Sequence, residues 1–128
     1  MKQEDKELLL KDLCCRLPYG VKMNHIADSE NNPITLVGIA KTMITLESSA
    51  GYGTSDIEDY IPYLFPISSM TEEQKDEIKK FFKSIEGQLV GLMGRNVYFI
   101  DFCNKNHLDY RGLISMGLAL DATGLNVY

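Results

Sequence analysis

The sequence predicts an α+β fold in a single domain that spans residues 1–128. Apolar residues recur at helical spacing near the start of the chain and again after residue 70, and a stretch rich in Ile, Thr, Val and Leu lies between them. No internal repeat, low-complexity tract or Pro- or Ser-rich linker divides the chain. We therefore expect an N-terminal helix, a small antiparallel sheet that could curl into a barrel-like form, and two or three C-terminal helices.

The first element is predicted to be a helix over about residues 4–16. Its acidic residues lie near the start and its basic residues near the end, as the helix dipole favours. The segment LPYG, residues 17–20, should end the helix, because proline cannot continue it and glycine tolerates the turn. The leucines at helical spacing are Leu9 or Leu10, Leu13 and Leu17.

The middle of the chain predicts the sheet. Residues 21–48 should form two or three antiparallel strands, and the Gly- and Ser-rich residues 49–56 should form a loop. Residues 57–70 contain Pro62 and Pro66, which restrict them to an edge strand, an extended segment or short helical turns.

The clearest predicted element is a helix over about residues 72–86. Thr71 followed by Gln74 is a capping box, which satisfies free backbone groups at a helix start. Apolar residues then form one stripe at helical spacing, at Ile78, Phe81, Phe82 and Ile85.

Residues 88–106 allow two interpretations. They could form a hairpin that turns at residues 94–96, or a Gly-rich loop that leads into a helix over about 97–106. We favour the helix, because Phe99, Phe102 and Cys103 fit its spacing.

The segment NHLDYRGLI, residues 106–114, predicts a further short helix. Asp109 is a favoured N-cap residue, and Gly117 would end a helix of about two turns that begins at Tyr110. Leu108 packing on Leu113 would then form a hydrophobic staple.

Composition narrows the function classes. The formal net charge of −5 disfavours binding to nucleic acid through phosphates and docking onto an anionic membrane, although a local basic patch stays possible in principle. No run approaches the roughly 20 apolar residues that span a bilayer. The charged N-terminal sequence does not resemble a secretory signal, so we expect a cytoplasmic protein.

No cofactor, metal or catalytic motif is predicted. The three cysteines, Cys14, Cys15 and Cys103, include no Cys-x-x-Cys pair and are expected in or near a core, in a reducing compartment. The two histidines, His25 and His107, lie in no recognised metal-ligand spacing.

The leading function hypothesis is a non-enzymatic protein-interaction module. Tyrosine and arginine are enriched at protein interfaces, so Tyr110 and Arg111, with His107 and Tyr19, are the candidate contact residues. One alternative is nucleic-acid binding through the sheet or through the lysines of the 72–86 helix. A second alternative is a small enzyme that uses His107 or Cys103, which share a helix face if that region is helical.

Three stretches, residues 7–21, 61–74 and 106–120, together carry a resemblance to known sequences. They resemble a group of short uncharacterised proteins from gut-dwelling anaerobic bacteria, often encoded in prophage-like or other mobile regions. The resemblance implies a bacterial accessory protein linked to a mobile element, and it implies no activity or catalytic residue.

Overall fold

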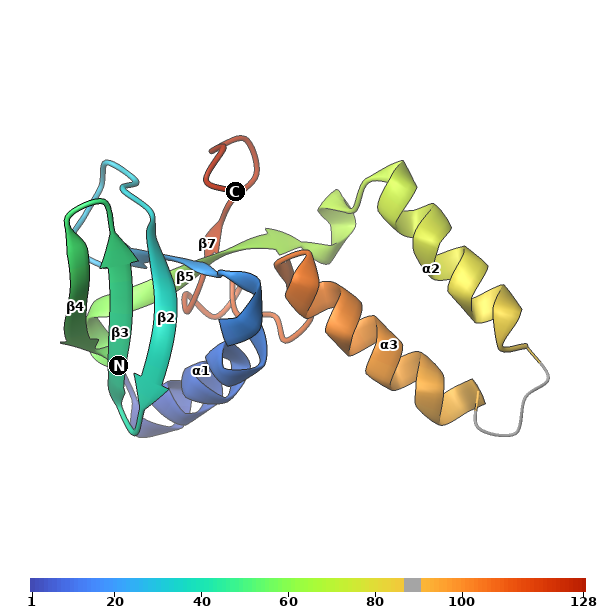
Figure 1. Ribbon diagram of the computed structural model, residues 1–128, viewed down its shortest axis with the longest axis horizontal. Coiled ribbons are helices and arrows are strands. Elements are labelled where there is room, and N and C mark those ends of the chain that lie inside the picture. The colour runs from blue at the N-terminus through green and yellow to red at the C-terminus, as the bar shows by residue number, and fades with distance from the viewer. Residues whose placement is uncertain (87–90) are drawn as a thin grey trace.

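The computed structural model describes residues 1–86 and 91–128, apart from the side chains of residues 91–93. The fold is α+β, as the sequence predicts. An N-terminal helix packs against a curved sheet, and two further helices extend from the sheet as an arm (Figure 1). The sheet does not close into a barrel, because its two outermost strands do not pair with each other.

Helix α1 (Gln3–Arg16) confirms the first predicted element. Leu9 and Leu13 on one of its faces are fully buried. A short 3₁₀ turn, η1 (Leu17–Tyr19), follows, and Gly20 then adopts a left-handed φ of 67° that turns the chain into the sheet.

Within the described residues, seven strands form one sheet, in the order β4-β3-β2-β1-β5-β6, with β7 also paired to β5. Neighbours among β1 to β5 are antiparallel, whereas β6 and β7 lie parallel to β5. The strands are β1 (Lys22–His25), β2 (Ile34–Ala40), β3 (Met43–Ser48), β4 (Gly51–Asp56), β5 (Tyr60–Pro66), β6 (Leu108–Asp109) and β7 (Leu120–Asp121).

One prediction for the sheet is wrong, and so is one of the three alternatives for residues 57–70, the edge strand. Residues 49–56, expected as a loop, contain β4, whose every residue pairs with β3. The Pro-containing strand β5 is interior rather than an edge, since Pro62 lies opposite Met23 of β1 and the other side of β5 accepts β6 and β7. Short 3₁₀ turns, η2 (Ile57–Asp59) and η3 (Ile67–Ser69), flank β5 as the prolines allow.

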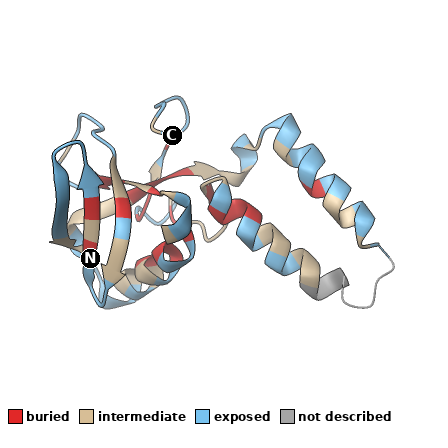
Figure 2. Ribbon diagram, viewed as in Figure 1, coloured by how far each residue is buried: buried red, intermediate tan, exposed pale blue. Residues whose placement is uncertain are grey.

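The main core lies between α1 and the inner face of the sheet (Figure 2). It also takes in side chains from the segment that follows β6, so the C-terminal residues close one side of it. Its fully buried members include Leu9, Leu13, Val21, Met23, Leu36, Ile44, Ile57, Leu64 and Leu113.

The arm consists of α2 (Glu72–Ser84) and α3 (Gly91–Lys105). Thr71 and Gln74 form the predicted capping box. The helix predicted over 97–106 is confirmed but begins earlier, and the alternative hairpin at residues 94–96 is wrong, because those residues lie inside α3. Part of the Gly-rich segment ahead of α3, at residues 87–90, lies outside the described residues.

The arm has its own small core, which reaches the sheet through Leu108. The ring of Phe81 in α2 stacks on that of Tyr98 in α3, with centroids 3.7 Å apart. Ile78, Phe102, Cys103 and Leu108 are the buried members of this second cluster.

The short helix predicted after Asp109 does not form. Asp109 pairs with β5, and its carboxylate accepts hydrogen bonds from the N–H groups of Leu113 (2.8 Å) and Ile114 (2.9 Å), later in the chain than an N-cap would. A single turn follows. The Leu118 N–H donates to the Leu113 carbonyl, as at a helix C-terminus, and Gly117 has a φ of 75°. Leu108 and Leu113 belong to different clusters and form no staple.

Candidate functional site

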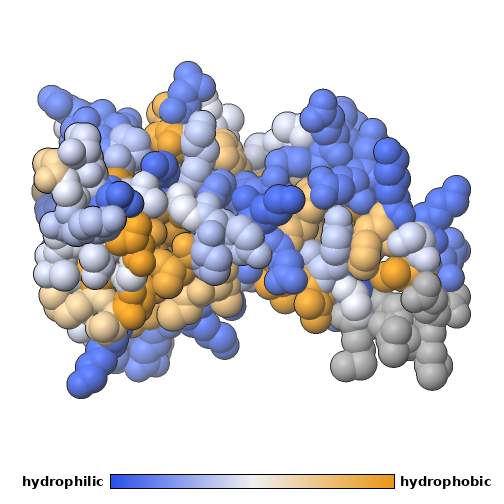
Figure 3. Space-filling model, in the orientation of Figure 1, coloured by the Kyte–Doolittle hydropathy of each residue, from blue (hydrophilic) through white to orange (hydrophobic). Residues whose placement is uncertain are grey.

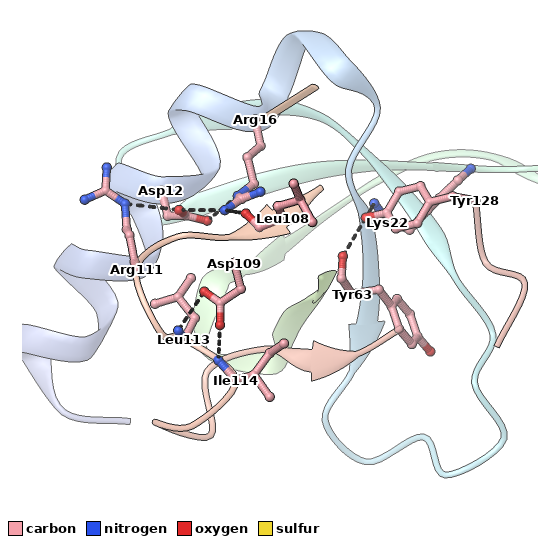
Figure 4. Close-up of polar contacts among 10 residues, drawn as sticks. All are labelled: Asp12, Arg16, Lys22, Tyr63, Leu108, Asp109, Arg111, Leu113, Ile114 and Tyr128. Carbon is pink, nitrogen blue, oxygen red and sulfur yellow. Dashed lines mark hydrogen bonds and ion pairs between the residues drawn. The ribbon is translucent and has the colours of Figure 1, made fainter. Parts of the chain in front are cut away.

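Segment 106–114 is anchored to α1 by a buried ion cluster (Figure 4). Arg16 is fully buried, and its Nε donates to Asp12 at 2.7 Å. Its Nη2 donates to the Leu108 carbonyl at 2.8 Å, and Arg111 Nε donates to the other Asp12 oxygen at 3.1 Å. One carboxylate therefore pairs with two guanidinium groups and joins α1 to the chain that leaves β6.

Tyr110 lies within this cluster rather than on the surface. The guanidinium carbons of Arg16 and Arg111 each lie 5.1 Å from the centre of its ring, within cation–π range. Burial, and then the negative charge of Asp12, raises the pKa of the Tyr110 hydroxyl. Tyr110 and Arg111 are thus partly buried, and the exposure that sequence reasoning expected for them is wrong.

The hydroxyl oxygen of Tyr110 and Nη1 of Arg16 are buried and make no hydrogen bond within the described residues. The Tyr110 ring and one carboxylate therefore hold the two cations. The arrangement is that of a structural clamp, since Asp12 and Arg16 are fully buried and Arg111 is bonded to Asp12.

His107 lies on the other side of the same segment. It has a φ of 59°, and its ring stacks on that of Tyr128 with centroids 3.7 Å apart. The Tyr128 hydroxyl donates to the Tyr63 carbonyl at 2.6 Å and accepts from the Lys22 N–H at 3.0 Å (Figure 4). Burial, followed by the positive charges of Arg16 and Lys22, lowers the pKa of His107 to about 4, so the ring is neutral at physiological pH.

Cys103 does not have the properties of a nucleophile. The side chain is fully buried, and burial raises the pKa of its thiol to about 11, whereas reactive cysteines are exposed and have a lowered pKa. The other two cysteines, Cys14 and Cys15, are exposed, so the prediction that they lie in or near a core is wrong.

Tyr19 lies in η1 and is 40% exposed. Among the described residues, no hydrogen bond or ring contact joins it to His107, Tyr110 or Arg111. The four predicted contact residues therefore do not form one continuous exposed surface.

The residues that sequence reasoning missed are Asp12 and Arg16. A signal for them was present, because positions 9, 12, 13 and 16 follow helical spacing and share the face of α1 that carries the buried leucines. A charged pair four residues apart on an apolar face indicates a buried ion pair.

Exposed apolar side chains occur on the outer face of α3. Val97 is 61% exposed and Ile100 is 40% exposed. The face of α3 that meets α2 is marked by Arg95, whose guanidinium lies over the Phe82 ring, and by Tyr98. Figure 3 shows apolar side chains on the side of α3 away from α2.

Two of the hollows on the described surface bear on the candidate sites. One of about 260 Å³ lies between β4 and the start of β5, and one of about 130 Å³ lies at the base of the arm. Neither is lined by Cys103 or His107. The smaller one is lined by Phe65, Ser69, Thr71, Gln74, Asn106 and Leu108.

The described residues contain no group of three or more His, Cys, Asp or Glu side chains that could hold a metal ion. Over the same residues, no helix has both the length and the apolar character that crossing a bilayer requires.

Comparison of the chain with protein-family models, with curated proteins and with solved structures finds no match.

Proposed function

We propose that this chain is a non-enzymatic protein-interaction module whose main contact surface is the outer face of the α2–α3 arm. The observation that carries the proposal is the pair of exposed apolar side chains, Val97 and Ile100, on a helix that extends away from the sheet. The resemblance to proteins of mobile regions supports the further proposal that the module is an accessory protein of a bacterial mobile element.

The geometry of α3 explains why this face is open. Residues 97, 100 and 104 lie on one side of the helix, opposite the side that stacks on α2. At the base of the arm this side is covered, since Asn104 is buried. Farther out it is uncovered and carries Val97 and Ile100, with the exposed Asp101 beside them. Exposed apolar side chains with polar neighbours on one helix face are typical of a surface completed by a partner.

Nucleic-acid binding through the lysines of α2 is less well supported than protein binding through α3. Lys75 pairs with Glu72 within the same helix, and Asp76 lies one turn before Lys79 and Lys80. The exposed side of α2 therefore has mixed charge, and such a surface attracts phosphates weakly. The exposed lysines of the helix are Lys75, Lys79, Lys80 and Lys83.

Capture experiments with matched variants test the proposal. The double variant V97Q/I100Q removes the apolar side chains but keeps good helix formers, so α3 should stay folded. The control N96Q/K105Q introduces the same residue at two exposed polar positions of α3.

Tagged wild-type and control proteins should recover the same stoichiometric protein partner from lysate of the native host, and V97Q/I100Q should lose it. Equal recovery by all three proteins would refute the arm as the contact surface. Recovery of nucleic acid in place of protein, released by salt, would refute the proposed function itself.

A further inference from the structure

We propose that the free edge of β4 is a second docking site, which binds an extended segment of another protein that is rich in basic residues and inserts one apolar side chain beside Gly53. The inference extends the proposed function to a separate surface. In Figure 1 β4 lies at the opposite end of the molecule from the arm.

The backbone of β4 offers unpaired hydrogen-bonding groups. β4 is the outermost strand of the sheet and pairs only with β3. The two-residue loop between β3 and β4 makes Ser48 and Gly51 the closing hydrogen-bonded pair. Bonded and non-bonded pairs alternate along an antiparallel ladder, so the N–H and C=O groups of Tyr52 and Thr54 point to the free edge. An added strand can bond to these groups.

The inner face of β4 is almost bare. Gly53 lies opposite Leu46 of the core, so both positions face inward. A Cβ atom on Gly53 would meet nothing within 4 Å, and the same holds for Gly51. The space left is the hollow of about 260 Å³, whose apolar lining comes from Ile34, Leu46 and Tyr60.

The size of the hollow suits a side chain. Small-molecule sites usually enclose roughly 300–1,000 Å³, and this hollow of about 260 Å³ lies below that range. A strand added to β4 would direct alternate side chains to the inner face, and the one level with Gly53 would enter the hollow. An apolar side chain there would cover Leu46 and Tyr60.

The edge also lacks the features that normally prevent strand addition. Natural edge strands carry lysine, proline or a bulge, and β4 contains none of these over its six residues. Tyr52 is 74% exposed on the opposite face, where it can pack on a side chain of the incoming strand.

Charge selects the partner. All charged side chains of residues 47–59 are acidic. Glu58 is paired with Lys6, which leaves Glu47, Asp56 and Asp59 without a salt bridge in the described residues. A basic segment would complement them, whereas a second copy of β4 would bring acid against acid. The occupant is therefore another protein's basic strand rather than a copy of this chain.

Synthetic peptides of defined charge test the site in the full chain. The probe is a fluorescent peptide of alternating Lys and Val with a central Phe, and its matched control has Glu in place of each Lys. We expect the Lys peptide to bind and to slow hydrogen exchange at the Tyr52 and Thr54 amides. Because the net negative charge of the protein alone attracts basic peptides, a Lys–Ser peptide without apolar residues is the second control.

Two variants separate binding from folding. G53V places a side chain in the hollow, where a Cβ atom meets nothing within 4 Å, so it should keep or raise the unfolding temperature. It should weaken binding of the Lys peptide about tenfold or more. T54V changes the opposite face, keeps the backbone donor and should bind like the wild type.

Equal binding of the Lys and Glu peptides would overturn the charge argument. Equal binding of the Lys–Ser peptide would overturn the claim that an apolar side chain enters the hollow. Protection from hydrogen exchange that is confined to α3, or no binding at about 1 mM peptide, would overturn the edge site. A dimer that forms in the wild type and is lost in G53V would assign the edge to a second copy instead. Loss of binding at the β4 edge would leave the arm proposal standing, because the arm is tested separately with V97Q/I100Q.

Discussion

The carboxylate of Asp12 forms ion pairs with two arginines, one of which is fully buried. D12N keeps the shape of the side chain but leaves Arg16 without a counter-charge in the core, so it should lower the free energy of unfolding by about 3–5 kcal/mol. R111Q should cost only about 1 kcal/mol, because Arg111 is 22% exposed and the Asp12–Arg16 pair remains. Urea denaturation of the three proteins measures both effects. A cost for D12N no larger than that for R111Q would contradict the clamp.

His107 should make stability depend on pH. An unfolded histidine has a pKa near 6.5, whereas burial and nearby cations lower the pKa of His107 to about 4 in the fold. The unfolded chain therefore binds the proton first as the pH falls. The contribution of His107 is complete above about pH 6.5 and is lost as the pH decreases toward about 4.

H107F isolates this contribution, because phenylalanine can still stack on Tyr128 but cannot be protonated. Between about pH 7 and pH 5 the wild type should lose roughly 2 kcal/mol more unfolding free energy than H107F does. Phenylalanine at a φ of 59° lowers the stability of the variant at every pH, so the comparison rests on the slope. Parallel pH profiles would show that His107 is protonated equally in both states.

At this scale the sequence predicted residue chemistry better than residue position. Asp109 was expected to cap backbone N–H groups, and it does, but for a turn that begins at Leu113. Arg111 was expected at the surface, but it turns inward to Asp12, which lies 99 residues earlier in the chain. A partner so distant leaves no local signal.

Among the elements, α2 depends most on its own ends. Its capping box satisfies backbone groups at its N-terminus, and only one of its residues, Ile78, is buried. T71A should therefore cost about 1 kcal/mol and speed hydrogen exchange in α2 while the amides of β1 to β3 stay unchanged. T123A, at an exposed position outside α2, is the control. Faster exchange throughout the sheet would contradict the view that the arm opens locally.

Helices and strands differed in how well they could be predicted. α1 and α2 carry periodic apolar stripes and end signals within their own residues, so their existence and ends could be predicted. β4 could not, because its glycines and serines are typical of loops and its strand form comes from pairing with β3. The same glycines leave the hollow beside the edge, so the wrongly predicted loop is part of a candidate binding surface.

On the scale of the whole molecule, the C-terminal segment joins the arm to the sheet. The Phe65 N–H donates to the His107 carbonyl at the end of α3, and the Ala122 N–H donates to the Leu64 carbonyl in β5. Arg16 fixes the intervening Leu108. These long-range contacts join the arm to the sheet. Local sequence patterns predict the α+β class, but they carry no signal for contacts so distant in the chain, so the open face of α3 was not predictable.

The most direct test of the central claim, that the arm is a protein-contact surface, is photo-cross-linking from position 97 in the native host. A photoreactive residue there, at the most exposed apolar position among the described side chains of α3, should give one discrete protein adduct. The adduct should be absent when the same residue is placed at the exposed Ser29 of the sheet body. Identical adducts from both positions, or no protein adduct from position 97, would contradict the account.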